Sequence, residues 1–297
     1  MNNFHTAEFK IYVLNSETIK ALYYEVILKR IGSLKKNKGK FTQVVNTIPN
    51  WIWLLISLLL AFILWQLLSV IPKTAIVFSS PKQIVLAFVK EEKLGTIWTN
   101  IGISLFRVLA GFILGFIVAI PVAFLMGWYK IFRNLVEPWI QFIRNIPPIA
   151  YIPLIIAGVG VDERAKVTVI FIATFLVMVI SIYQGVRNVD ETLIKAAKVL
   201  GANNRVIFLK VVVPASTPFI LVGVRLGLAA ALTTLVAAEM TGASSGLGMM
   251  VWSAGQYYDM PVVLLGIVII GILGLVFEKF VKFLERRLTG WQETHVA

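Results

Sequence analysis

Residues 51–71 read WIWLLISLLLAFILWQLLSVI and contain no charged side chain. As an α-helix, this run is long enough to cross a hydrocarbon core of ~30 Å, and its tryptophans suit the membrane interfaces. Similar runs recur along the 297 residues, which are 58% hydrophobic and only 14% charged. Soluble proteins average roughly a quarter charged residues. The sequence therefore predicts an all-α, polytopic membrane protein with a single membrane domain.

Five more apolar segments follow the first, so we expect about six spans, with five or seven as alternatives. The third is unusual, because residues 131–161 include three charged side chains and several prolines, Pro147 and Pro148 among them. Freed backbone groups at membrane depth need protein or water as partners, which predicts a broken helix beside a water-filled path. Residues 72–100 should form an external linker with one interfacial helix at 83–89. The remaining spans are predicted at residues 101–128, 167–183, 211–238 and 261–277.

Lysine and arginine set the expected orientation. The net charge of +13 comes mainly from basic residues that flank the apolar runs, a pattern typical of membrane topology rather than of nucleic-acid binding. With the N-terminus in the cytoplasm, the inner segments hold about nineteen basic residues and the outer ones about six. We therefore expect a cytoplasmic basic tail at residues 1–50, a membrane domain at 51–284 and a second cytoplasmic tail at 285–297. The first tail contains either an interfacial helix that meets the lipid bilayer or a solvated segment.

The scarcity of reactive side chains excludes several kinds of chemistry. The chain has no cysteine, and its two histidines, His5 and His295, lie near the termini. Disulfides are excluded, and neither a metal site nor a histidine proton relay is expected. Paired carboxylates and Ser-His-Asp sets are lacking as well, so we predict no catalytic residues and no enzyme activity for this chain.

The segment between the fourth and fifth spans has the pattern of two short cytoplasmic helices. Asp190 can cap a helix over residues 191–200, and Gly201 suits the left-handed position that ends such a helix. The second helix is expected at residues 205–210, with Asn203 or Asn204 as its cap.

One face of this segment suits a protein partner. Leu193, Ala196, Ala197 and Leu200 recur at helical spacing, so they share a side of the first helix. The small alanines allow close approach of another chain, while Leu193, Leu200 and Phe208 offer apolar anchors. The alternative is an amphipathic loop that lies on the membrane surface.

Four charged residues lie in or at the edges of apolar segments, where an arginine at the bilayer centre costs ~2.5–3.5 kcal/mol. They should face protein or water, and we expect Arg107 to pair with Glu239. Arg225 could line an electropositive path for an anion; the alternatives are a buried ion pair or an interfacial position. The candidate path residues are Arg107, Arg144, Pro147, Pro148, Arg225, Thr233, Thr234 and Glu239.

Residues 195–201, KAAKVLG, resemble the E-A-A-x3-G-x9-I-x-L-P signature of the membrane subunits of ATP-binding-cassette (ABC) importers. Ala196, Ala197, Gly201 and Pro214 fall at the matching spacings. Lys195 replaces the acidic residue, which leaves apolar packing to carry the contact, and valines replace the isoleucine and leucine. Residues 104–112, 144–148 and 245–248 together with Glu239 look like the branch that carries nitrate, sulfonates, taurine and bicarbonate.

The resemblance implies a type I ABC importer permease with about six helices, working as a dimer in a bacterial inner membrane. It implies two copies of a separate ATPase, which use ATP and Mg, and an external solute-binding protein. The chain lacks a G-x-x-x-x-G-K-[ST] phosphate loop, so no cofactor is expected to bind to it. Relatives of the branch include permeases for thiamine precursors and riboflavin. The expected ATPase-coupling residues, within a loop at 190–210, are Leu193, Ala196, Ala197, Leu200, Gly201, Phe208 and Pro214.

An ion-coupled secondary transporter or channel that works without an ATPase is the alternative function. A transporter of that kind typically has inverted repeats, or a relay of acidic or histidine residues within its spans, and the sequence shows neither.

Overall fold

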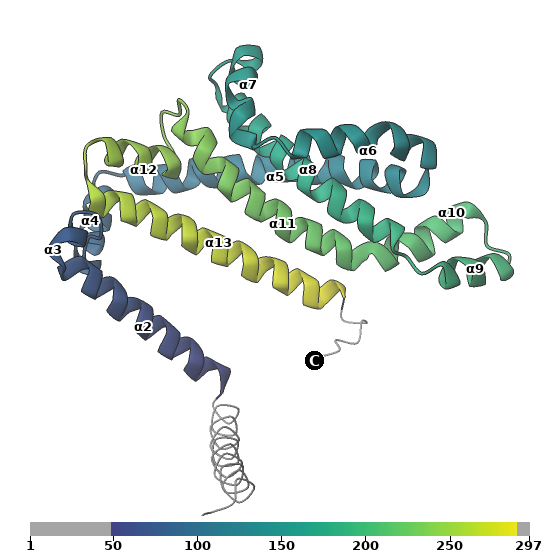
Figure 1. Ribbon diagram of the computed structural model, residues 1–297, viewed down its shortest axis with the longest axis horizontal. Coiled ribbons are helices and arrows are strands. Elements are labelled where there is room, and N and C mark those ends of the chain that lie inside the picture. Colours follow the sequence, from purple (N-terminus) through teal and green to yellow (C-terminus); the bar gives the residue numbers. More distant parts are fainter. Residues whose placement is uncertain (1–48, 290–297) are drawn as a thin grey trace, which may run out of the picture. The chain divides into compact units, whose positions relative to one another are not determined.

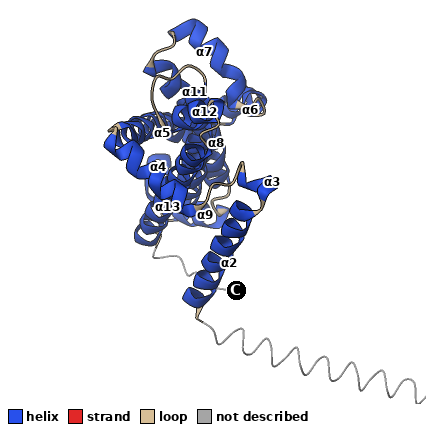
Figure 2. Ribbon diagram, turned by 90° about the vertical axis from the view of Figure 1, so that its left-hand side faces the viewer, coloured by secondary structure: helices blue, strands red, loops and turns tan. Residues whose placement is uncertain are grey.

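The computed structural model describes residues 49–289, and within this range all regular elements are helices (Figure 1 and Figure 2). Five helices are long and apolar enough to cross a membrane, and a bent pair counts as a sixth span if it is taken as one. This agrees with the six spans predicted from the sequence. The expected interfacial helix of the N-terminal tail lies outside the described residues.

The described chain divides after Leu64, inside the first helix, into two units. That helix is α2 (Asn50–Val70), which matches the first predicted span. The elements that follow are α3 (Pro72–Ala75), α4 (Pro81–Lys93), α5 (Thr96–Trp128), α6 (Lys130–Arg144), η1 (Pro148–Tyr151), α7 (Ile152–Val159), α8 (Glu163–Arg187), α9 (Glu191–Val199), α10 (Asn204–Ile207), η2 (Phe208–Val212), α11 (Val213–Met240), α12 (Leu247–Gln256) and α13 (Met260–Leu288).

The core of the second unit is built around α8, along which both α5 and α11 pack. Glycines allow this close approach. A Cβ atom on Gly111 of α5 would lie 2.6 Å from Ile170 Cγ2, and one on Gly227 of α11 would lie 2.7 Å from Met178 Cγ. Such spacing is too short for any side chain, so Gly111 and Gly115, one turn apart on α5, form a packing face for α8.

The predicted broken helix is present between α5 and α8. The chain turns by 95° between Lys130–Arg144 and Pro148–Val159, and Figure 1 shows α7 projecting away from α6. Pro147 and Pro148 lie at the turn, where a residue without an N–H cannot continue a helical hydrogen-bond ladder. The expected interfacial helix is α4, whose first turn is closed by reciprocal hydrogen bonds between Ser80 and Gln83.

The structure extends three predicted helices and adds one. α13 continues to Leu288 rather than ending at residue 277. α5 begins at Thr96 rather than at residue 101. α8 begins at Glu163, so it includes a charged first turn that the apolar pattern had excluded. The added element is α12, which follows the small-residue stretch read from the sequence as a loop or re-entrant turn. The start of α12 has a clear cause, because side chains of a polar cluster accept hydrogen bonds from the first N–H groups of this helix.

Candidate functional site

α9 is a separate short helix, as expected for the first half of residues 190–210. The second expected helix is not separate, because α10 continues through η2 into α11 and residues 204–240 form one helix. The Asp190 carboxylate accepts a hydrogen bond from the Thr192 N–H at 2.7 Å, which caps α9. Gly201 has φ +79°, the left-handed conformation that glycine adopts without steric cost. The N–H groups of Gly201 and Ala202 each donate to carbonyls in the last turn of α9 at 3.0 Å, which closes the helix as a Schellman motif.

The predicted apolar face of α9 is divided between solvent and protein. Leu193 is 50% exposed, Leu200 is 86% exposed, and Ala196 is exposed between them. Ala197 instead packs inward with Ile194 against the main apolar core. α9 is therefore held to the rest of the second unit along one line of residues and presents another line outward.

Phe208 is half-buried and packs against the end of α5. Its ring contacts the rings of Phe124 and Trp128 edge-on, with centroids 5.5 Å and 5.3 Å apart. Asn203, rather than Asn204, caps α10 by accepting the Val206 N–H at 2.9 Å. The aromatic contacts join η2 to the end of α5, beside an apolar groove of about 620 Å³. Pro214 lies exposed in the first turn of α11.

Lys195, the residue that departs from the importer signature, pairs with Glu191 one turn earlier on α9. The Lys195 ammonium lies 2.9 Å from the Glu191 carboxylate, and both side chains are exposed. The hydrogen bond from Lys195 lowers the pKa of Glu191, and the same bond raises the pKa of Lys195. The hydrogen bond from Thr192 lowers the pKa of Asp190. The exposed start of α9 therefore carries an acidic group despite the substitution.

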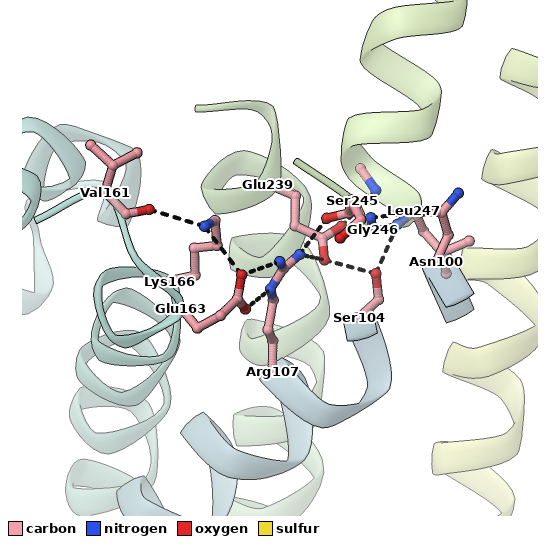
Figure 3. Close-up of polar contacts among 11 residues, drawn as sticks. Asn100, Ser104, Arg107, Val161, Glu163, Lys166, Glu239, Ser245, Gly246 and Leu247 are labelled. Atoms are coloured by element: carbon pink, nitrogen blue, oxygen red, sulfur yellow. Dashed lines mark hydrogen bonds and ion pairs between the residues drawn. The ribbon is translucent and has the colours of Figure 1, made fainter. Parts of the chain in front are cut away.

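A buried polar cluster lies at the opposite end of α8 (Figure 3). Arg107 of α5 is fully buried, and its guanidinium forms a bidentate pair with Glu163 of α8, with N···O distances of 2.5 Å and 2.6 Å. The Arg107 Nη1 atom also donates to Glu239 of α11 and to the Ser245 carbonyl, each at 2.7 Å. Lys166 approaches the Glu163 carboxylate at 3.4 Å. The expected Arg107–Glu239 pair is thus present, within a larger network.

The same cluster caps α12. Three consecutive N–H groups at the start of this helix donate to side chains of α5, which is far away in the sequence, and of α11, the preceding helix. Unpaired N–H groups at a helix start would be costly when buried, so these side chains fix where α12 begins. The bonds run from Gly246 N to Asn100 Oδ1 (2.8 Å), from Leu247 N to Ser104 Oγ (2.8 Å) and from Gly248 N to Glu239 Oε2 (2.7 Å).

Ser104 and Gly246 complete the close fit. The Ser104 hydroxyl donates a hydrogen bond to Glu239 Oε1 at 2.7 Å and accepts one from the Leu247 N–H, so it acts as both donor and acceptor. Gly246 has φ +127°, and a Cβ atom there would lie 2.5 Å from the Glu239 carboxyl carbon and 2.6 Å from Arg107 Nη1. Only glycine fits at this position.

The other candidate path residues lie elsewhere. Arg225 pairs with Glu285 of α13, and its Nε atom is buried without a hydrogen-bond partner in residues 49–289. Arg225 is fourteen residues from Glu239 along α11, or ~21 Å at 1.5 Å per residue. The Thr233 hydroxyl is exposed and donates to its own helix, whereas Thr234 is buried. Arg144, Pro147 and Pro148 lie together at the turn after α6.

Sequence reasoning missed Glu163, Lys166 and Asn100. Glu163 and Lys166 fall in a charged stretch that reads as a loop, and Asn100 was assigned to the linker before the second span. A spacing of three between Glu163 and Lys166, which is helical, was the one available signal. Among the described residues there is no group of three or more histidine, aspartate or glutamate side chains that could hold a metal ion.

Comparison with known proteins identifies the class of transporter. Residues 111–290 match the family described as binding-protein-dependent transport system inner membrane component. A probable ABC transporter permease protein of Brucella abortus (strain 2308) is 56% identical over 199 residues, which cover 67% of this chain and 80% of that protein. The taurine transport system permease protein of Escherichia coli (strain K12) is 38% identical over 66% of this chain and 71% of its own length.

Two further similarities agree with this result. A putative aliphatic sulfonates transport permease protein of Bacillus subtilis (strain 168) is 33% identical over 89% of this chain and 97% of its own length. A solved structure of the MetNI methionine ABC transporter in an inward-facing conformation matches 67% of this chain and 98% of its own, with a TM-score of 0.59 and 20% identity. At that identity the structural match shows the fold. The chain belongs to the family of binding-protein-dependent transport system inner membrane components, the non-catalytic permease subunits of ABC importers.

Proposed function

We propose that this chain forms the membrane path of an importer for a small anionic solute, with the α9–η2 segment as its contact for an ATPase. The observation that carries the proposal is the geometry of that segment. Leu193, Ala196 and Leu200 are exposed on a short helix whose two ends are closed by Asp190 and Gly201. An apolar side chain on a rigid, capped helix makes a good anchor, because little conformational entropy is lost on docking.

We further propose that two copies of this chain pair in the membrane, with two ATPases on the cytoplasmic side and a solute-binding protein outside. Both chain termini would lie in the cytoplasm, as the distribution of lysine and arginine favours. The ATPases would bind ATP and Mg, and this chain would bind no cofactor of its own. Closure of the ATPase pair would draw the two α9–η2 segments together and open the path outward, in an alternating-access cycle.

Phe208 and Ala197 take a different role from the exposed residues. They pack into the permease body, so they would hold the segment against α5 and pass its movement on. Leu193, Ala196 and Leu200 would make the contact with the ATPase. Glu191, paired with Lys195, would supply the acidic group that the signature places one turn later.

The substrate class rests on the relatives. Their names specify taurine, aliphatic sulfonates and bicarbonate, all of them small anions or zwitterions that carry an oxyanion group. Arg225 would contribute positive charge to the path, since its side chain is 41% exposed and a guanidinium has more donors than the pair with Glu285 uses.

The test replaces Gly201 with glutamate and uses Gly95 as a matched control. Both glycines have φ between +70° and +80°, and a Cβ atom on either would meet no atom within 4 Å. The backbone strain of ~1–2 kcal/mol is therefore similar in the two variants, and only the location differs. We expect Gly201→Glu to uncouple ATP hydrolysis from solute uptake in proteoliposomes, and Gly95→Glu to retain uptake. Wild-type uptake in Gly201→Glu, measured on a complex of normal composition, would reject the assignment of the segment.

A further inference from the structure

We infer that the Arg107–Glu163 ion pair is the link through which movement of the α9–η2 segment reaches α12, on the opposite side of the membrane. This inference rests on the proposed function and adds a positioning role for Glu163. Two distant regions are involved, the α9–η2 segment and the start of α12, and α8 extends from the first to the Arg107 cluster beside the second.

At its C-terminal end, α8 is tied closely to α9. Three residues, 188–190, separate Arg187 from Glu191, and the middle one, Val189, is buried in the main apolar core. Such a short and partly buried connection leaves little freedom between the two helices. A displacement of α9 therefore has to be taken up by α8.

α8 is suited to carry the displacement along its length. It spans 25 residues, or ~37 Å, and contains no proline, whereas its neighbours α5 and α11 contain Pro121 and Pro218 in their interiors. Proline interrupts the hydrogen-bond ladder and favours bending at that point. An uninterrupted helix moves as one body over its whole length.

At its N-terminal end, α8 engages Arg107 through a contact with fixed geometry. Both Glu163 oxygens are bonded to the guanidinium, one to Nε and one to Nη2, so the two groups lie in one plane. The Arg107 side chain is fully buried, while Glu163 is 49% exposed. If α8 moved away alone, a buried cation would lose one of its two carboxylates. Arg107 is therefore expected to follow Glu163.

From Arg107 the network leads directly to α12. The same guanidinium binds the Ser245 carbonyl and Glu239, and Glu239 in turn binds the Gly248 N–H (Figure 3). Asn100 and Ser245, which belong to this network, also line a cavity of about 500 Å³ beside α12. A shift of Arg107 would thus change the position of the first turn of α12 and the shape of this cavity. In the proposed orientation, the cavity lies at the external side.

The experiment measures the response of this region to nucleotide in the full complex with its ATPase. The chain has no native cysteine, so a single Ser244→Cys substitution introduces the one thiol in the subunit, and uptake by this variant sets the reference. The rate of labelling by a membrane-impermeant maleimide is compared with and without ATP under conditions that prevent hydrolysis. Glu163→Gln is introduced into this background. Asp162→Asn is the control, because Asp162 is adjacent and exposed and its side chain makes no capping hydrogen bond to α8.

We expect ATP to change the labelling rate in the reference and in Asp162→Asn, and the change to disappear in Glu163→Gln. The number of solute molecules transported per ATP hydrolysed should fall about tenfold in Glu163→Gln, within the range of coupling between distant sites. A purely structural Glu163 would lower the thermal unfolding temperature and leave both the labelling response and the transport ratio of folded complexes at reference values. That result would overturn the inference.

A second variant tests the Arg107–Glu163 link if the Glu163→Gln subunit does not assemble with the ATPase. Glu163→Asp keeps the charge and shortens the side chain by one methylene, so the bidentate contact is stretched while the cation stays neutralised. A reduced labelling response in Glu163→Asp supports the link, and a full response overturns it. Failure of the proposed function is distinguishable, because it would appear as an ATPase that does not bind or as wild-type uptake in Gly201→Glu.

Discussion

Replacing Gly246 with alanine tests the polar cluster where its fit is tightest. The added Cβ atom would lie 2.5 Å from the Glu239 carboxyl carbon and 2.6 Å from Arg107 Nη1, so the buried ion pair has to move apart. The φ of +127° adds backbone strain of ~1–3 kcal/mol for any residue other than glycine. Loss of one hydrogen bond to a charged group costs a further ~1.5–3 kcal/mol. The expected destabilisation is therefore ~3–6 kcal/mol.

Gly201→Ala provides the comparison for this prediction. Gly201 also has a positive φ, but its Cβ position is open, so alanine there adds only ~1–2 kcal/mol of strain. The difference between the two variants isolates the cost of disturbing the ion pair, which we expect to be ~2–4 kcal/mol. At ~2 °C per kcal/mol for a chain of this size, Gly246→Ala should unfold ~4–8 °C below Gly201→Ala in detergent. Unfolding temperatures that agree within the measurement error would refute the clash and the network behind it.

Two further predictions concern charged groups. Arg225→Ala should raise the KM for an anionic solute about tenfold, with Glu285→Gln as the control for loss of the ion pair; unchanged transport in Arg225→Ala would remove Arg225 from the path. The second concerns pH. Because the pKa values of Asp190 and Glu191 are lowered in the folded protein, their stabilisation of α9 is present above the ordinary values of 3.8 and 4.5 and is lost as the pH falls through the folded values. Protection of the Thr192 amide from hydrogen exchange, corrected for the intrinsic rate, should hold from pH 7 to about 4 and decline as the pH falls further; protection that stays constant until the protein unfolds in acid would contradict this.

Local signals in the sequence were sufficient for α9. Asp190 and Gly201 act on their own helix, so their roles as cap and terminator follow from residue type and position. The sequence narrowed the cap of α10 to two asparagines, and the geometry selects Asn203. Phe208 was expected to be an apolar anchor for a partner, and its contacts with Phe124 and Trp128 could not be predicted, because periodicity defines a face of a helix but does not identify which neighbour covers it.

The polar cluster was predictable only in part. Arg107 and Glu239 stand out because each is a charged residue inside an apolar run. The topology placed both near the same face of the membrane, which made them candidate partners, and the pair is present. Glu163 carries no such signal, since it lies among other charged residues at the end of an apolar segment. α12 begins without a local cap, and its N–H acceptors come from residues up to 146 positions away, so no short-range pattern predicts its start.

The long sequence separation between Arg107 and its partners has a consequence for the synthesis and membrane insertion of the protein. Glu163 is synthesised 56 residues after Arg107, and Glu239 is synthesised 132 residues after it. At 5–20 residues per second, the ribosome needs ~7–26 s to reach Glu239, and during that time the arginine of α5 has no carboxylate from α11. Release of α5 into lipid would meanwhile cost ~2.5–3.5 kcal/mol if Arg107 reached the bilayer centre. We therefore expect nascent α5 to remain beside the insertion machinery until α8 arrives, so that these two helices enter the bilayer as a pair.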